Sequence, residues 1–324
     1  MKTLFIETTM GASGDMLLGA LIGLMPEPEK FVERLNQLGF ENLEVKCKTK
    51  TSMGIAGNRI KVRFDGQEEC GHKDHHEHEK KHKKHHEHHE GCCGKHHKGD
   101  AHEHHEGCCG RHHKKDHHSE HFGSAPLIIA AKDSRSHHHK DGKHHKEHKE
   151  HSHNDLASLG KIIDTLDVDE IIKSQAKEVY QIIAEAEAKA HNMEVSQIHF
   201  HELGEKDAVF DIVAVCLAID ELEVDKIIAT PIHVGYGKVK TAHGKLPIPT
   251  PATAEILRGI PIYSKDVKGE LCTPTGASLL KYFVNEFRQM PMAVWDKIGY
   301  GVGKKEFEEP NILRCFIGES MILD

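Results

Sequence analysis

The spacing of apolar residues near the start of the chain predicts alternating strands and helices. Leu4, Phe5 and Ile6 form an apolar run of the length of a buried strand, and a glycine-rich turn follows it. Further on, Phe31 and Leu35 recur at helical spacing. Together the pattern predicts strands at residues 4–6, 43–50 and 58–64, and helices at residues 16–22 and 29–38.

A second patterned region begins near Asn154 and predicts longer helices. Two of them should begin alike, because Thr250 and Thr273 stand at cap positions and a proline follows each in the first helical position. Beyond the last helix, a glycine turn is expected at residues 301–303. The predicted helices are residues 156–163, 169–191, 207–219, 251–259 and 274–287, and the predicted strands are within residues 225–235, 295–300 and 312–317.

Between these regions the chain loses its apolar pattern and becomes rich in histidine. Residues 72–153 hold 27 of the 32 histidines, mixed with lysine and glutamate. So many imidazoles cannot all be buried with partners, so this tract is expected to be a solvated, disordered insertion. We therefore predict an α+β fold in which residues 1–70 and 154–324 form one composite α/β core and residues 71–153 form a metal-binding insertion.

The histidine tract contains a short internal repeat, in which residues 86–98 recur as residues 102–114 with Lys95 replaced by Arg111. Imidazole and thiolate groups bind borderline divalent metals such as Ni²⁺. The adjacent cysteines lack the spacing of a zinc finger, so we predict bulk metal binding, with a tolerated low-complexity insertion as the alternative. The predicted ligands are His85, His86, His88, His89, Cys92, Cys93, His104, His105, Cys108, Cys109, His112 and His113.

One stretch of the second region places histidines close to carboxylates. His199 and His201 share a face if the backbone there is extended. Asp207 and Asp211 are one turn apart on an otherwise apolar helix, where like charges destabilise each other. A polar network in which Lys206 pairs with one aspartate is the alternative to a metal or acid–base site. The predicted catalytic residues are His199, His201, Glu202, Asp207 and Asp211.

Residues at predicted helix starts are candidate contacts for an anion. Ser13 and Asp15 lie where the helix after the glycine-rich turn begins, and either could cap it. The N-terminus of a helix presents N–H groups that can bind a phosphate or a carboxylate. Ordinary caps are the alternative. The predicted cofactor-binding residues, all taken as loop residues near helix starts, are Ser13, Asp15, His243, Lys245, Thr273, Thr275 and Gly276.

The overall composition excludes some classes of function. The formal net charge of −8 argues against a nucleic-acid partner, which requires a basic surface. No run of 18 apolar residues is long enough to span a membrane, and the first residues do not resemble a signal peptide. The cysteines outside the tract show no framework spacing, so we expect a reducing, cytoplasmic location.

Several short motifs in a fixed order resemble the LarC family of nickel insertion proteins. They are GASGDM at residues 11–16, HFHE at 199–202, TAHG at 241–244, PTPAT at 249–253, TPTGA at 273–277 and GYGVG at 299–303. The resemblance covers both patterned regions, and a histidine-rich insertion at this place is also a feature of that family.

The resemblance implies a nickel insertase of the metal-chelating lyase class. It would insert Ni²⁺ into pyridinium-3,5-bisthiocarboxylic acid mononucleotide, with CTP and Mg²⁺ or Mn²⁺, to make the nickel-pincer cofactor of lactate racemase. It implies as partners a chain that carries the family's C-terminal domain, or a homo-oligomer, and other lactate racemase maturation proteins. The alternatives are a non-catalytic nickel store or metallochaperone, and a phosphosugar or nucleotide enzyme with a metal buffer.

Overall fold

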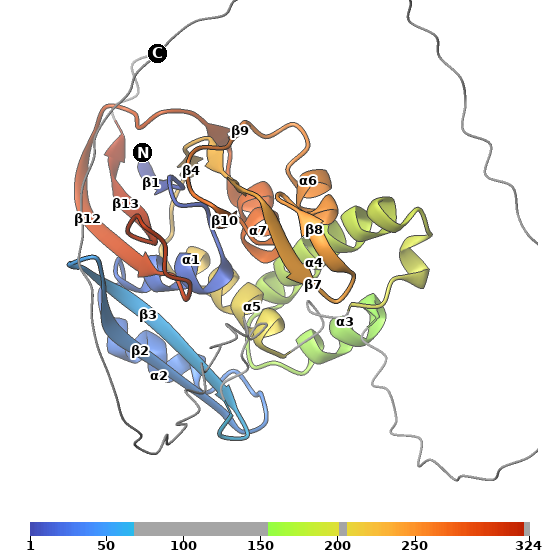
Figure 1. Ribbon diagram of the computed structural model, residues 1–324. Helices are drawn as coiled ribbons and strands as arrows, with labels where there is room; N and C mark the ends of the chain where they lie inside the picture. Colours follow the sequence, from blue (N-terminus) through green and yellow to red (C-terminus); the bar gives the residue numbers. More distant parts are fainter. Residues whose placement is uncertain (68–154, 201–205, 321–324) are drawn as a thin grey trace, which may run out of the picture. The chain divides into compact units, whose positions relative to one another are not determined.

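The computed structural model describes residues 1–67, 155–200 and 206–320, which build a mixed α/β unit around a seven-stranded sheet (Figure 1). The strand order is β11-β4-β1-β13-β12-β3-β2. The strands of this sheet are β1 (Lys2–Glu7), β2 (Leu43–Ser52), β3 (Ile55–Phe64), β4 (Lys226–Ala229), β11 (Glu286–Phe287), β12 (Ala293–Val302) and β13 (Ile312–Ser320). This confirms the predicted combination of α and β structure, while the predicted insertion lies outside the described residues.

Two helices, α1 and α5, are buried along almost their whole length. Within α1 every residue except Asp15 is buried, and between residues 208 and 219 of α5 every residue except Asp211 is buried. Both exceptions are carboxylates on otherwise apolar helices. The helices are α1 (Gly14–Ile22), α2 (Pro28–Leu35), α3 (Leu156–Asp164), α4 (Glu170–His191), α5 (Lys206–Glu221), α6 (Pro251–Ile256) and α7 (Pro274–Phe283), with a 3₁₀ turn η1 (Val195–Gln197). No helix in the described part is long and apolar enough to cross a membrane.

Strand β1 is an inner strand of the sheet, and the glycine-rich turn follows its carboxyl end. It runs parallel to β4 and antiparallel to β13, and its Leu4 and Ile6 belong to the main core. On the opposite face, Phe5 packs with Phe316 in a smaller cluster. Because β1 and β4 are parallel, their carboxyl ends lie together, and the Thr8 and Thr230 hydroxyls meet there at 2.9 Å. The turn that leads into α1 therefore starts where functional residues of α/β sheets commonly lie.

Six short strands form ribbons outside the main sheet. They are β5 (Ile232–His233) with β9 (Ile262–Tyr263), β6 (Gly235–Tyr236) with β10 (Gly269–Glu270), and β7 (Lys238–Thr241) with β8 (Gly244–Pro247). The β7–β8 hairpin lies beside α4 (Figure 1). The predicted strand within residues 225–235 is therefore three short strands, β4, β5 and β6.

Several predicted element boundaries are wrong by a few residues. Helix α7 ends at Phe283 instead of residue 287, because Val284 is extended and β11 pairs with β4. Helices α2 and α6 end three residues earlier than predicted. The predicted turn at residues 301–303 is also wrong, since Gly301 and Val302 continue β12. A Cβ on Gly301 would lie 1.8 Å from the Met16 carbonyl oxygen, so this glycine serves close helix–strand packing.

Candidate functional site

Two predicted helix starts, those of α1 and α7, lie side by side in the structure. The Ala12 N–H donates to the Leu271 carbonyl at 3.1 Å, and the Thr273 N–H donates to the Ala12 carbonyl at 3.0 Å. A Cβ on Gly276 would lie 2.2 Å from the Ala12 oxygen. These contacts bring Ser13 next to the first turn of α7, so two motifs far apart in the sequence form one surface.

Of the three predicted side-chain caps, at α1, α6 and α7, only that of α7 is confirmed. Ser13 holds the cap position of α1, but its hydroxyl donates to Asp15 Oδ1 at 2.5 Å instead of accepting a backbone N–H. Asp15 Oδ1 also accepts the Met16 N–H at 3.1 Å, which is a backbone donor that a Ser13 cap would have accepted. Thr273 caps α7 as predicted, because its hydroxyl accepts the Gly276 N–H at 3.2 Å. The Thr250 hydroxyl instead meets that of Thr253 at 2.9 Å.

A group of three carboxylates lies where the first turn of α1 meets the first two turns of α5. Gly14 is packed so closely that a Cβ there would lie 2.6 Å from Asp211 Oδ2, and Asp15 follows it in the chain. Asp211 is half-buried, and its loss of contact with water raises its pKa well above the ordinary value, as do the negative charges of Asp15 and Asp207. Lys304 acts in the opposite direction. We call Asp15, Asp207 and Asp211 the carboxylate cluster.

Lys304 was not anticipated from the sequence. It lies between β12 and β13, directly after Gly303, at which a Cβ would lie 2.9 Å from the Met16 sulfur on α1. The Gly303 carbonyl accepts from Arg59 Nη1 of β3 at 3.5 Å, so this end of the loop contacts both α1 and β3. Lys304 is exposed, and its partial loss of contact with water lowers its pKa, but the charges of Asp15, Asp211 and Asp207 outweigh this effect and raise the pKa. Its place directly after the GYGVG motif is the sequence signal that could have identified it.

The histidine stretch before α5 is only partly described. His199 is exposed between buried Ile198 and buried Phe200, the alternation expected of an extended backbone. Phe200 stacks edge-on with Tyr180 of α4 at 6.0 Å between ring centroids. Burial raises the pKa of Tyr180, and so do the charges of Asp207 and Asp211, which places this ring near the cluster. His201 and Glu202 lie outside the described residues, so the predicted histidine–carboxylate site stays a prediction.

The alternative, in which Lys206 pairs with an aspartate of α5, also stays a prediction. The Lys206 ammonium group lies over the ring of Phe64, 5.8 Å from the ring centroid. A described cation that acts on Asp211 is Lys304.

His243 and Lys245 do not lie at a helix start, contrary to the prediction. Lys245 is part of β8, and His243 is in the turn between β7 and β8, where Gly244 has a φ of +97°. This left-handed conformation suits a glycine and lets the chain fold back as a hairpin. The His243 ring contacts that of His191 at the end of α4. Thr275 is buried in the first turn of α7.

The structure does not test the predicted metal ligands of the tract, which all lie outside the described residues. Within residues 1–67, 155–200 and 206–320, no three histidine, cysteine, aspartate or glutamate side chains are already arranged to hold a metal ion. Cys216, Cys272 and Cys315 are buried. A divalent cation at the carboxylate cluster would therefore need a rearrangement or a ligand from the substrate.

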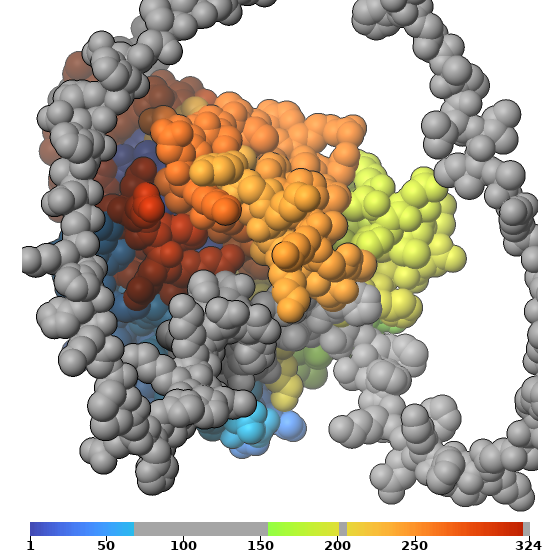
Figure 2. Space-filling model, in the orientation of Figure 1, coloured from blue at the N-terminus to red at the C-terminus, as the bar shows by residue number. Residues whose placement is uncertain are grey.

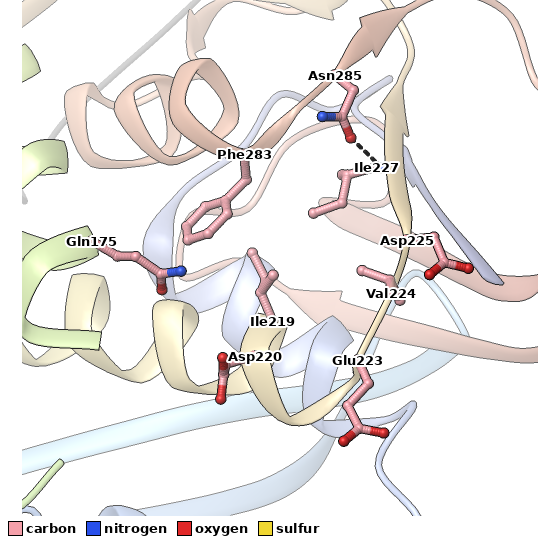
Figure 3. A pocket seen from close by; sticks show the side chains of 9 residues that line it. All are labelled: Gln175, Ile219, Asp220, Glu223, Val224, Asp225, Ile227, Phe283 and Asn285. Carbon is pink, nitrogen blue, oxygen red and sulfur yellow. Dashed lines mark hydrogen bonds between the residues drawn. The ribbon is translucent and has the colours of Figure 1, made fainter. Parts of the chain in front are cut away.

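A cavity of about 420 Å³ lies at the other end of α5 (Figure 3). Carboxylates of Asp220, Glu223 and Asp225 line it, together with the apolar Phe283. The Asn285 carboxamide oxygen, also at this cavity, accepts the Ile227 N–H at 2.8 Å. Because the carboxylate cluster belongs to the first two turns of α5 and this cavity to its last turn, the two are separate features.

Comparison with known proteins finds a matching family and several similar proteins. The chain matches the family described as nickel insertion protein over residues 4–323. Three similar proteins are all named pyridinium-3,5-bisthiocarboxylic acid mononucleotide nickel insertion protein. The one from Staphylococcus epidermidis strain RP62A is 46% identical over 313 residues, which cover 97% of this chain and 58% of that protein. The one from Geobacillus kaustophilus is 42% identical over 320 residues, which cover 98% and 60%.

The third similar protein, from Thermotoga sp. strain RQ2, is 32% identical over 320 residues, which cover 98% of this chain and 61% of that protein. The chain therefore spans about three fifths of the length of these relatives. No solved structure matches the chain.

Proposed function

The chain belongs to the nickel insertion protein family, and from this premise we propose that it inserts Ni²⁺ into pyridinium-3,5-bisthiocarboxylic acid mononucleotide. The observation that supports this role within the chain is the carboxylate cluster with Lys304. Three carboxylates at a partly buried helix junction, one with a raised pKa, form a place where a cation and a proton can be exchanged.

The reaction requires a proton acceptor. Insertion replaces a ring C–H bond of the substrate by a C–Ni bond, and two thiocarboxylate sulfurs bind the same nickel, so one proton leaves the ring. Asp211 is our candidate for this acceptor, because its raised pKa makes its carboxylate a stronger base than an ordinary aspartate. Asp15 and Asp207 supply the negative charge that attracts the incoming Ni²⁺.

The substrate phosphate also requires a site. The start of α7 is our candidate, because a helix N-terminus attracts anions and Thr273 already fixes its first turn. The start of α1 is less suitable, since Asp15 lies in its first turn and would repel a phosphate. Ser13 directly precedes α1 and lies next to the first turn of α7. Its backbone is proposed to orient the substrate.

The family resemblance extends the proposal to the rest of the reaction. CTP and Mg²⁺ or Mn²⁺ are proposed co-reactants, and the product is proposed to serve lactate racemase. A chain that carries the family's C-terminal domain, or a homo-oligomer, is the partner that the resemblance supports. A reducing cytoplasm is proposed because the tract thiols must stay reduced to bind nickel.

A nickel store or metallochaperone is the second candidate function, and it is favoured by the 27 histidines of residues 72–153. Deleting these residues separates the two functions. A store would lose its bound nickel and would form no product with or without the tract. An insertase would still form product at high nickel concentration, because its reaction site lies elsewhere.

The proposed function is tested by product formation. The chain is incubated with the pyridinium substrate, Ni²⁺, CTP, Mg²⁺ and the region of a longer relative that this chain does not span. Mass spectrometry should show a species that gains one nickel and loses the protons it replaces. Absence of this species, when the intact relative forms it under the same conditions, would contradict the proposal.

A further inference from the structure

The end of α4 and the turn of the β7–β8 hairpin bring two imidazole rings together. His191 is the last residue of α4, and His243 lies between β7 and β8. Their ring centroids are 4.9 Å apart, with 47° between the ring planes. Both residues are exposed, and the two segments meet on the face shown in Figure 2, with the α4 region in yellow-green and the hairpin in orange.

This ring separation matches two imidazoles that bind one metal ion. A metal–nitrogen bond of about 2.1 Å puts each ring centre roughly 3.2 Å from the metal, so a bond angle of about 100° separates the centres by roughly 5 Å. The observed 4.9 Å is close to this value. Imidazole is a preferred ligand of Ni²⁺, Cu²⁺ and Zn²⁺, whereas Mg²⁺ prefers oxygen.

A neighbouring carboxylate is placed to support one of the rings. Glu187, one turn earlier on α4, has its Oε2 3.5 Å from His191 Nε2. Metal-bound histidines commonly direct their second ring nitrogen toward a carboxylate, which fixes the ring and increases its basicity. With Nε2 of His191 engaged in this way, Nδ1 is the ring nitrogen that the proposal assigns to a metal.

We propose that His191 and His243 form a two-imidazole site for a borderline divalent metal ion, with Glu187 orienting His191 and water completing the coordination. With two protein ligands from the described part of the chain, such a site suits the reception and release of an ion. It is distinct from the carboxylate cluster, because His191 lies about 16 Å along α4 from Tyr180, the residue of that helix near the cluster.

The part that this site would play in nickel insertion rests on the proposed function, whereas metal binding by the two histidines does not. The site offers the nickel cargo a place on the folded unit, reached from solution or from the tract. Metal binding by the pair requires neither the pyridinium substrate nor CTP.

Site-resolved histidine modification tests the pair in the full chain. Diethyl pyrocarbonate modifies accessible imidazoles, and peptide mass spectrometry reads His191 and His243 separately from the tract. With nickel at ten times the Kd, about nine tenths of sites are filled, so modification of both residues should slow about tenfold. Mg²⁺ at the same concentration should give no protection.

Reciprocal variants decide whether the two rings act together. In His243→Ala the nickel protection of His191 should be lost, and in His191→Ala that of His243 should be lost. Lys245→Ala on the same hairpin is the matched control and should keep both protections, and melting temperatures verify that each variant is folded. Protection of His191 that survives His243→Ala, or no protection at saturating nickel, would overturn the site. Because no substrate is present, this failure would leave the insertion proposal unaffected.

Discussion

Gly14 and Asp211 are packed so closely that a methyl group on the glycine would lie 2.6 Å from the Asp211 Oδ2 atom. The contact joins the first turn of α1 to the second turn of α5. It holds Asp211 beside Asp15, the next residue of α1. The arrangement of the carboxylate cluster therefore depends on the absence of a side chain at residue 14.

Substitution of Gly14 tests this dependence. Gly14→Ala should lower the free energy of unfolding by roughly 1–3 kcal/mol, because the added methyl group must displace the aspartate. Gly160→Ala in α3 is the control, since nothing lies within 4 Å of the added Cβ there, and it should raise stability by up to about 1 kcal/mol. Urea unfolding of both variants measures the difference. Equal stability gains in the two variants would contradict the close contact.

Asp211 should make stability depend on pH in a direction opposite to that of most aspartates. Its folded pKa is raised, so folding favours the protonated form, and this contribution is lost as the pH rises through the folded pKa. Asp211→Asn should therefore melt at a higher temperature than the natural protein at pH 8, and the difference should shrink as the pH falls toward 4. Scanning calorimetry across this range measures it. A variant that melts lower at pH 8 would indicate that the ionised carboxylate is stabilising.

The separate halves of the site could be predicted from the sequence, but their meeting could not. The apolar runs around Asp15 and Asp211 predict buried helices, and helical spacing places Asp207 and Asp211 on one face. Their approach to each other depends on how α1 and α5 pack beside the sheet. That packing relies on long-range contacts such as that of Gly14, which no local pattern encodes.

Residues in loops and hairpins were the least predictable part of the site. Lys304 reaches the cluster because Gly303 packs on α1, a contact between opposite ends of the chain. His243 was expected near a helix start, but it lies in the turn of a hairpin, whose first strand β7 shows the alternating exposure of a strand. The predicted end of α7 was wrong because residues 286–287 pair with β4 as a strand instead of continuing the helix.

Lys304 should adjust the acidity of the proposed proton acceptor. Its positive charge lowers the pKa of Asp211, so Lys304→Met should raise that pKa and move the acidic limb of the insertion activity profile to higher pH. Lys305→Met is the matched control, because Lys305 is the next residue and its ammonium lies 3.8 Å from Glu270 instead. Product formation measured from pH 5 to pH 9 gives both profiles. If the acidic limb of the pH profile stays in place in Lys304→Met, the ionisation of Asp211 does not determine that limb.

Three cysteines of the folded unit should be chemically inert. Burial raises the pKa of the Cys272 thiol to about 12 and those of Cys216 and Cys315 further. Since the thiolate is the reactive form, iodoacetamide at pH 8 should leave all three unmodified in the native protein and alkylate them after denaturation. Peptide mass spectrometry measures the extent. Rapid native alkylation would show that these thiols are accessible and could serve as nickel ligands.

The central claim, that the carboxylate cluster is the site of nickel insertion, is tested most directly by product formation in Asp211→Asn. Asp220→Asn at the exposed end of α5 is the control. Nickel-containing product and melting temperature are measured on the same samples, with the remaining family region, CTP and Mg²⁺ supplied. We predict that Asp211→Asn loses at least about 100-fold in rate, the lower range for removing an acid–base group, while it stays folded and still binds nickel through the tract. A folded Asp211→Asn protein that forms product as fast as the Asp220→Asn control would contradict the claim.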